Sequence, residues 1–189
     1  EEWVTKFTEF KNSIDLFNYI LHIFGGEFLD NLIIGNVSGN GDCYINSILS
    51  FIKFFENKTD EEINDINDHI KPSVTHAYEM ELMEIGTSSN ELTETLHKNL
   101  YHDVGIVKHL TTQTRCTITV LFWDSEKPTT AVPPLTFWNN VYNISSIKDH
   151  YFIININNHC YSLILNDKND RSALFRKLGG HDAIKFFVN

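Results

Sequence analysis

Apolar side chains recur at intervals of three and four residues near the start of the chain, with lysine and aspartate between them. This spacing predicts an amphipathic helix over residues 3–24, ended by Gly25 and Gly26. We expect its apolar stripe to pack on the rest of the chain. Residues 1–29 would then be an N-terminal helix packed on the domain of residues 30–189, and the whole chain would be a single domain. The stripe consists of Trp3, Phe7, Phe10, Ile14, Phe17, Leu21 and Phe24.

The middle of the chain has mainly helical patterns. Residues 38–42 (SGNGD) predict a loop, and apolar side chains then recur at helical spacing from Cys43 to Phe55, which places Cys43 at or beside a helix N-terminus. A capping-box sequence at residues 59–62 (TDEE) opens a second predicted helix, which should end before Pro72. The other predicted helices cover residues 74–85, 90–100 and 102–111.

Strand patterns occur mostly in the second half of the chain. β-Branched and aromatic residues predict strands over residues 31–37, 116–123, 151–156 and 160–165. The last two are separated by a short polar turn, so we expect a β-hairpin there. Helices largely separated from late strands indicate an α+β fold, with helices flanking a small, mostly antiparallel sheet.

Composition and charge narrow the function classes. Fifteen Lys and Arg against twenty-five Asp and Glu give a net charge of −10, so the chain lacks the cationic excess expected of a protein that binds nucleic acid or an anionic membrane. No apolar stretch is long enough to span a membrane. The odd number of cysteines (Cys43, Cys116 and Cys160) predicts thiols in a reducing compartment, the cytoplasm or nucleus.

One pair of residues could carry chemistry. The positive end of a helix dipole favours a thiolate, so Cys43 is a candidate nucleophile. Loop amides around Gly41 and Asp42 could hold an oxyanion, and His159, at the start of an apolar strand, could act as base and acid. Cys160 should point to the opposite strand face from His159 and, like Cys116, pack as a small apolar residue. The histidines lack metal-ligand spacing, and we expect neither a metal nor another cofactor.

Three segments resemble the ovarian tumour (OTU) family of cysteine deubiquitinases. Residues 39–48 (GNGDCYINSI) resemble its Gly-Asp-Gly-Asn-Cys-aromatic signature. Residues 103–110 (DVGIVKHL) followed by 116–120 (CTITV) are similar to its helix-then-strand pair, and residues 158–164 (NHCYSLI) to the strand that carries its catalytic histidine. The matches follow the family's order over about residues 30–166. The resemblance implies a papain-like fold of OTU type, with Cys43 and His159 as catalytic residues.

The chain departs from the family pattern in the residues that would orient the histidine. The family's usual Asp before the cysteine is Asn40 here, Asp42 replaces its usual Asn, and Tyr161 occupies its alternative acid position. We expect Asn40 to accept the hydrogen bond from the His159 ring or to belong to the oxyanion loop, and Asp42 to face solvent or a backbone amide. Other candidates for orienting the ring are Asn158, Asn166 and Asp167, and a bare Cys–His dyad stays open.

The resemblance implies a deubiquitinase that hydrolyses the peptide or isopeptide bond after the C-terminal glycine of ubiquitin or a ubiquitin-like protein. The expected partner is therefore ubiquitin or a relative, and the acidic surface suits a basic partner. Two alternatives remain: another papain-like Cys–His enzyme, and a ubiquitin-binding pseudoenzyme that has lost catalytic competence. A composition rich in Asn, Ile, Lys and Phe is typical of an AT-rich genome, which fits a secreted effector or viral protein acting in a host cell.

Overall fold

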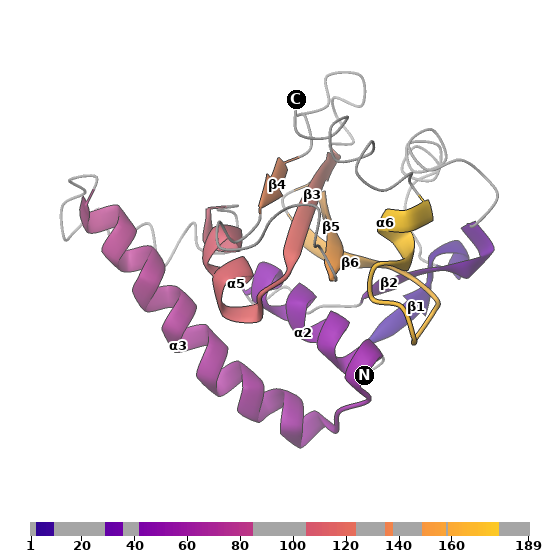
Figure 1. Ribbon diagram of the computed structural model, residues 1–189, viewed down its shortest axis with the longest axis horizontal. Helices are drawn as coiled ribbons and strands as arrows, with labels where there is room; N and C mark the ends of the chain where they lie inside the picture. The colour runs from indigo at the N-terminus through magenta and orange to yellow at the C-terminus, as the bar shows by residue number, and fades with distance from the viewer. Residues whose placement is uncertain are drawn as a thin grey trace.

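The computed structural model describes residues 3–9, 29–35, 42–84, 105–123, 135–137, 149–157 and 159–177, and its centre is a six-stranded sheet (Figure 1). The strand order is β1-β2-β6-β5-β3-β4. Only the β3–β5 pairing is parallel among these five neighbouring pairs, so the sheet is mostly antiparallel, as the sequence predicted. The strands are β1 (Val4–Lys6), β2 (Leu32–Gly35), β3 (Thr117–Trp123), β4 (Leu135–Phe137), β5 (His150–Ile156) and β6 (His159–Leu165).

Helices pack on both faces of this sheet. The α-helices of the described residues are α2 (Cys43–Glu56), α3 (Asp60–Glu84), α5 (Ile106–Thr114) and α6 (Ala173–Lys177). Tyr151 of β5 stacks on Phe51 of α2, with ring centroids 4.2 Å apart, whereas the preceding residue, His150, stacks on Phe175 of α6. Because neighbouring strand residues point to opposite faces, α2 and α6 cover opposite faces of the sheet. The α+β fold class is therefore confirmed.

The first predicted helix is wrong where the structure describes it. Val4–Lys6 forms strand β1, which pairs antiparallel with β2, and Phe7–Glu9 forms a 3-10 turn. The backbone N–H and C=O groups of β1 bond to the edge of β2. The apolar spacing alone had predicted helical hydrogen bonds for the same groups. The rest of the predicted helix, the predicted helix over residues 90–100 and the loop before Asp42 lie outside the described residues.

The break predicted at Pro72 is also wrong, because α3 runs continuously through it. The capping box itself is confirmed: the Thr59 backbone N–H donates to Glu62 Oε1 and the Glu62 N–H donates to Thr59 Oγ1, both at 3.1 Å. Buried residues lie on both sides of the proline, among them Ile63 and Val74. Their packing stabilises the helix across the hydrogen bond that proline cannot donate.

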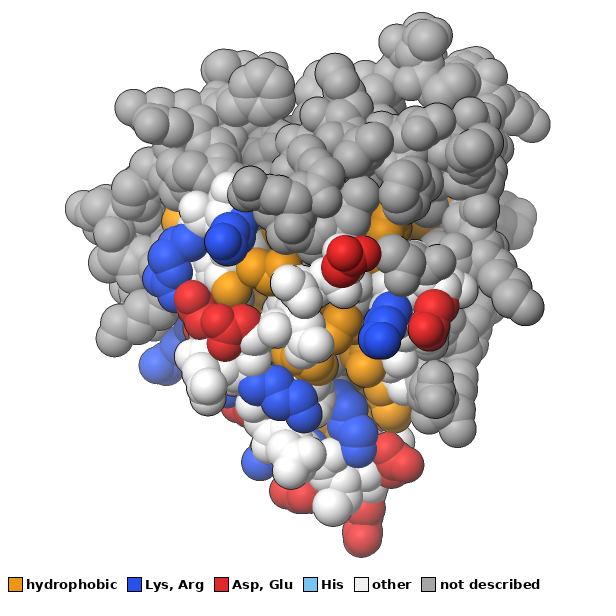
Figure 2. Space-filling view, turned by 90° about the vertical axis from the view of Figure 1, so that its right-hand side faces the viewer, with side chains coloured by type: hydrophobic (Ala, Val, Ile, Leu, Met, Phe, Trp, Pro, Cys, Tyr) orange, Lys and Arg blue, Asp and Glu red, His pale blue; other side chains and the backbone are white. Residues whose placement is uncertain are grey.

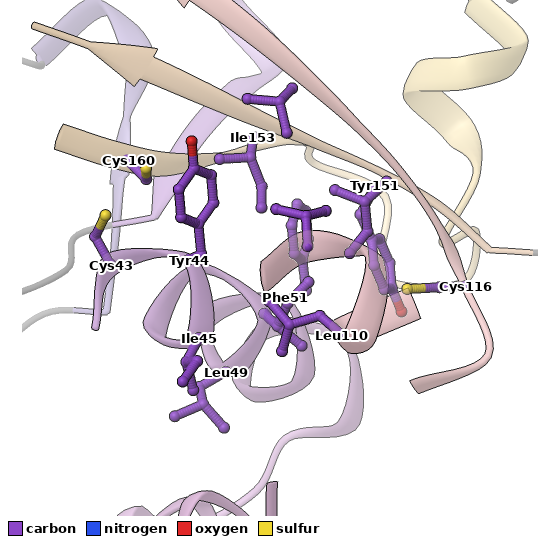
Figure 3. Close-up of a cluster of buried hydrophobic side chains, with 14 of the residues drawn as sticks. Cys43, Tyr44, Ile45, Leu49, Phe51, Leu110, Cys116, Tyr151, Ile153 and Cys160 are labelled. Carbon is purple, nitrogen blue, oxygen red and sulfur yellow. The ribbon is translucent and has the colours of Figure 1, made fainter. Parts of the chain in front are cut away.

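The helix beginning at Cys43 and the late hairpin are confirmed. The cysteine is the first residue of α2, and β5 and β6 pair antiparallel across the turn, with Ile156 opposite His159. The main buried cluster lies between this sheet and α2, α3 and α5, and Figure 3 shows part of it. Figure 2 shows apolar side chains between lysines, arginines and acidic side chains on one face of the molecule. Within the described residues, no helix combines the length and apolar character needed to cross a membrane.

Candidate active site

Cys43 occupies the first position of a helix and is fully buried. The backbone N–H of Asn46 donates to the Asp42 carbonyl at 2.8 Å, which closes the first turn of α2. The pKa of the Cys43 thiol lies below its ordinary value, chiefly because the Cys160 thiol donates a hydrogen bond to it; burial opposes the shift and backbone contacts reinforce it. A lowered pKa favours the thiolate, the nucleophilic form of cysteine.

The contact between Cys43 and Cys160 crosses from α2 to β6. Both side chains have no solvent exposure, and their sulfur atoms point toward one another in Figure 3. Burial and the neighbouring Cys43 sulfur raise the pKa of Cys160 far above its ordinary value. Of the two sulfurs, Cys43 is the one that carries negative charge more readily.

Two polar side chains surround this pair. Asn155 of β5 lies opposite Cys160 in the hairpin, and its Nδ2 atom lies 3.7 Å from the Cys160 sulfur. The same amide donates to the Tyr44 hydroxyl at 3.0 Å, and that hydroxyl in turn lies within hydrogen-bonding reach of Cys160. The two thiols thus lie at the edge of a buried polar network, in a cluster that is otherwise mainly apolar.

A line of small residues lets α2 approach the sheet closely. We call it the small-residue seam; it comprises Gly35 of β2, Cys43, Ser47 and Ser50 of α2, and Cys160 and Ser162 of β6. Ser162 Oγ donates to the Ser47 carbonyl at 2.5 Å, and Ser47 Oγ donates to the Cys43 carbonyl at 2.7 Å. A Cβ atom at Gly35 would lie 2.9 Å from the Cβ atoms of both Ser50 and Ser162. The seam therefore fixes the end of α2 that carries Cys43 against β6.

The Asp42 carboxylate pairs with a lysine of another helix. We expected it to face solvent or a backbone amide; its Oδ2 accepts a hydrogen bond from Lys71 Nζ of α3 at 2.6 Å, in an exposed contact. The Asp42 side chain makes no hydrogen bond that caps α2. The lysine offsets a negative charge that would otherwise disfavour a thiolate at the next residue.

His159 is the first residue of β6, directly before Cys160. By strand alternation its ring lies on the opposite face from the Cys160 thiol, with Tyr161. The His159 and Tyr161 rings meet edge to face, with centroids 4.7 Å apart. Burial raises the pKa of the Tyr161 hydroxyl, and the charges of the Cys43 and Cys160 sulfurs add to the shift. The pairing of the His159 imidazole with the Cys43 sulfur stays a prediction.

The remaining predicted site residues divide into two groups. Asn40, Gly41 and Asn158 lie outside the described residues. Asn166 and Asp167 follow the far end of β6, and a strand of this length separates them from His159 by about 20 Å. Both are thereby excluded as residues that orient the His159 ring in this fold.

The interpretation of the third cysteine is confirmed and a new feature has emerged. Cys116 is buried, and burial raises its pKa to about 12, so it is not an activated thiol. None of the three cysteines forms a disulfide. The small-residue seam was not predicted from the sequence, although the spacing of Cys43, Ser47 and Ser50 on an apolar helix was a usable signal. No metal-binding cluster of three or more His, Cys, Asp or Glu side chains occurs among the described residues.

Comparisons with known proteins complete the description of the site. No protein-family model and no curated protein sequence matches the chain. Among solved structures, the viral OTU domain protease from Farallon virus is similar, with a TM-score of 0.36 and 16% sequence identity. The similarity covers 71% of this chain and 92% of the viral protein.

Proposed function

We propose that this chain is a cysteine protease of OTU type that hydrolyses the bond after the C-terminal glycine of ubiquitin or a ubiquitin-like protein. The observation that carries the proposal is the position of Cys43, a thiol of lowered pKa at the first residue of a helix, against the strand that begins with His159. The sequence resemblance at residues 39–48 and 158–164 supplies the substrate class. We expect this protease to act in a reducing compartment, the cytoplasm or nucleus, either of its own cell or of a host cell.

The proposed reaction uses groups of this chain alone. The Cys43 thiolate attacks the glycine carbonyl carbon, and backbone N–H groups at residues 40–43 hold the oxyanion. His159, protonated at that stage, gives its proton to the leaving amine, so the carbon–nitrogen bond breaks and a thioester remains. Water, deprotonated by His159, then attacks the thioester carbonyl and releases the carboxylate and Cys43.

The burial of Cys43 sets a condition on this reaction. The side chain has no solvent exposure, so a substrate carbonyl reaches the sulfur only when the groups that cover it move. The same burial favours a second candidate function, a ubiquitin-binding pseudoenzyme. The two candidates differ in whether a covalent bond to Cys43 forms.

A ubiquitin probe with an electrophilic C-terminus tests the proposal under reducing conditions. We expect a covalent adduct at Cys43 that is lost in Cys43→Ala and retained in the matched control Cys116→Ser. Binding of ubiquitin without an adduct would support the pseudoenzyme instead. Reaction of Cys43 with a small alkylating reagent, with no ubiquitin adduct or binding, would indicate a papain-like enzyme with another substrate.

The group that orients His159 is tested separately. We expect Asn40→Ala to lower turnover by about tenfold or more without changing the unfolding midpoint, and Asn40→Asp to be tolerated, since either side chain can accept the ring N–H. Unchanged turnover in Asn40→Ala would remove this residue from the mechanism and leave Asn158 or a bare Cys–His dyad.

A further inference from the structure

The contact between two buried thiols has chemistry of its own, independent of any hydrolase activity. Cys43 and Cys160 come from different elements, α2 and β6, and lie far apart in the sequence. Hydrogen bonding between the two thiols and the facing sulfur atoms in Figure 3 bring them within contact. The two sulfurs are therefore neighbours in the folded chain.

We propose that Cys43 and Cys160 form a reversible disulfide when the protein meets hydrogen peroxide, with Cys43 as the sulfur that is oxidised first and Cys160 as the resolving thiol. This bond would occupy Cys43 and join the start of α2 to β6. The oxidant is a small peroxide because the pair is buried and larger oxidants have no direct access to it.

The reaction has two balanced steps. The Cys43 thiolate attacks one peroxide oxygen; the sulfur–oxygen bond forms, the oxygen–oxygen bond breaks, and hydroxide leaves with the proton lost from Cys43 as water. The Cys160 sulfur then attacks the Cys43 sulfur of the sulfenic acid. The sulfur–sulfur bond forms, the sulfur–oxygen bond breaks, and the Cys160 proton leaves with the hydroxyl group as a second water. One peroxide is reduced and two thiols are oxidised.

The surroundings of the two thiols determine the order of the steps. Cys43 accepts the hydrogen bond and lies at the helix N-terminus, so it has the more reactive sulfur. The Cys160 thiol, which donates that bond, already points at the sulfur it would attack. The Tyr44 hydroxyl and the Asn155 amide beside Cys160 can hydrogen-bond the departing hydroxyl group.

The small-residue seam supplies the close backbone approach that a disulfide needs. At Gly35, the space between β2, α2 and β6 is too small for one methyl group. The hydrogen bond from Ser162 to the Ser47 carbonyl holds helix and strand together one turn beyond Cys43. The seam therefore holds the backbones of α2 and β6 close together near the two thiols.

Peptide mapping by mass spectrometry tests the proposal on the whole chain. The reduced protein is treated with hydrogen peroxide, remaining thiols are alkylated in denaturant, and the peptides are analysed. We expect one main product, two hydrogens lighter, that joins the peptides of Cys43 and Cys160 and is reversed by dithiothreitol, with Cys116 alkylated. In Cys160→Ser, peroxide should instead convert Cys43 irreversibly to its sulfinic or sulfonic acid, whereas Cys116→Ser should behave like the unmodified chain.

Two controls keep the result independent of folding defects and of the proposed function. Circular dichroism verifies that Cys160→Ser is folded, and Cys160→Ala serves as a second variant. Oxidation in denaturant should lose the preference for Cys43–Cys160 and favour the shorter loop between Cys116 and Cys160. Irreversible oxidation of Cys43 in the unmodified chain, to the same extent as in Cys160→Ser, would overturn the proposal, as would a main product that contains Cys116. The readout is a covalent bond within the chain. The result therefore does not depend on whether the ubiquitin probe labels Cys43.

Discussion

Gly35 is the position at which the seam between α2 and the sheet can be tested most directly. In Gly35→Ala the new methyl carbon would lie 2.9 Å from the Cβ atoms of both Ser50 and Ser162, and 3.1 Å from Ser162 Oγ. Carbon atoms in ordinary contact are about 3.5–4.0 Å apart, so two neighbours are too close by about 0.6–1.1 Å each. The two Cβ atoms are fixed by the backbone of a helix and a strand and cannot swing aside, and Ser162 Oγ can turn away only by losing its hydrogen bond to the Ser47 carbonyl.

The expected cost follows from this overlap. Overpacking of a rigid core by one methyl group destabilises a protein by about 1–3 kcal/mol. With a urea dependence of about 2 kcal/mol per molar, as expected for a chain of this size, the unfolding midpoint should fall by about 0.5–1.5 M. Urea unfolding followed by circular dichroism measures the midpoint and the slope, and the slope should stay unchanged.

A mutant cycle separates overlap from other effects of alanine at this site. In a background with Ser50→Gly and Ser162→Gly, which removes both opposing Cβ atoms, Gly35→Ala should cost much less than in the unmodified chain. Stability in Gly35→Ala within about 0.5 kcal/mol of the unmodified chain would refute the tight seam, since surface-like positions show changes of that size. An equal cost in both backgrounds would refute the overlap as its cause.

Two further predictions concern ionisable groups. Burial lowers the pKa of His150 from 6.5 to about 3. Below pH 6.5 the unfolded chain therefore takes up a proton that folded His150 does not. The free energy of unfolding should fall as the pH falls from 6.5 toward 3, by about 2 kcal/mol at pH 5. Urea unfolding between pH 7 and pH 5 measures this loss, which should be largely absent in His150→Gln. Lys71→Met leaves the Asp42 carboxylate uncompensated beside Cys43, so the Cys43 pKa should rise, and the pH dependence of the Cys43 alkylation rate measures this rise.

Each of these predictions has a matched comparison. His150→Gln can keep a hydrogen bond to Thr119, which bonds the His150 Nε2 atom at 2.7 Å, so the comparison isolates the titration from the loss of that bond. Equal pH dependence in both proteins would show that His150 is not the source. For Lys71, the control is Lys58→Met, which removes a lysine paired with Glu62 on the surface. A change of Cys43 reactivity in this control of the same size would contradict a local effect of Lys71.

The local elements of the site could be predicted from the sequence. A glycine-containing loop followed by apolar side chains at helical spacing determines that a helix begins at Cys43, and two β-branched runs with a short polar turn determine the hairpin that contains His159. The capping box at Thr59 could also be predicted from the sequence, because its two hydrogen bonds join residues three positions apart. Such features depend on neighbours in the chain, which periodicity and turn chemistry describe.

Features that depend on packing were predicted incorrectly or not at all. The continuation of α3 through Pro72 depends on burial of Val74 and Ile63 in one core, and the β1 strand at Val4–Lys6 depends on an available edge of β2. In both cases tertiary contacts outweigh a local preference of a few kcal/mol or less. Likewise, the ion pair of Asp42 comes from a lysine on a different helix.

The sequence by itself determined an acidic α+β domain with a thiol at a helix start and a histidine at a strand start. Only the tertiary structure decided that the Cys43 sulfur meets Cys160, because that contact depends on the register of β6 in the sheet and on how closely Gly35 and Ser162 let α2 approach. The period of a strand tells which residues share a face, but it does not tell which face a helix from another part of the chain will cover.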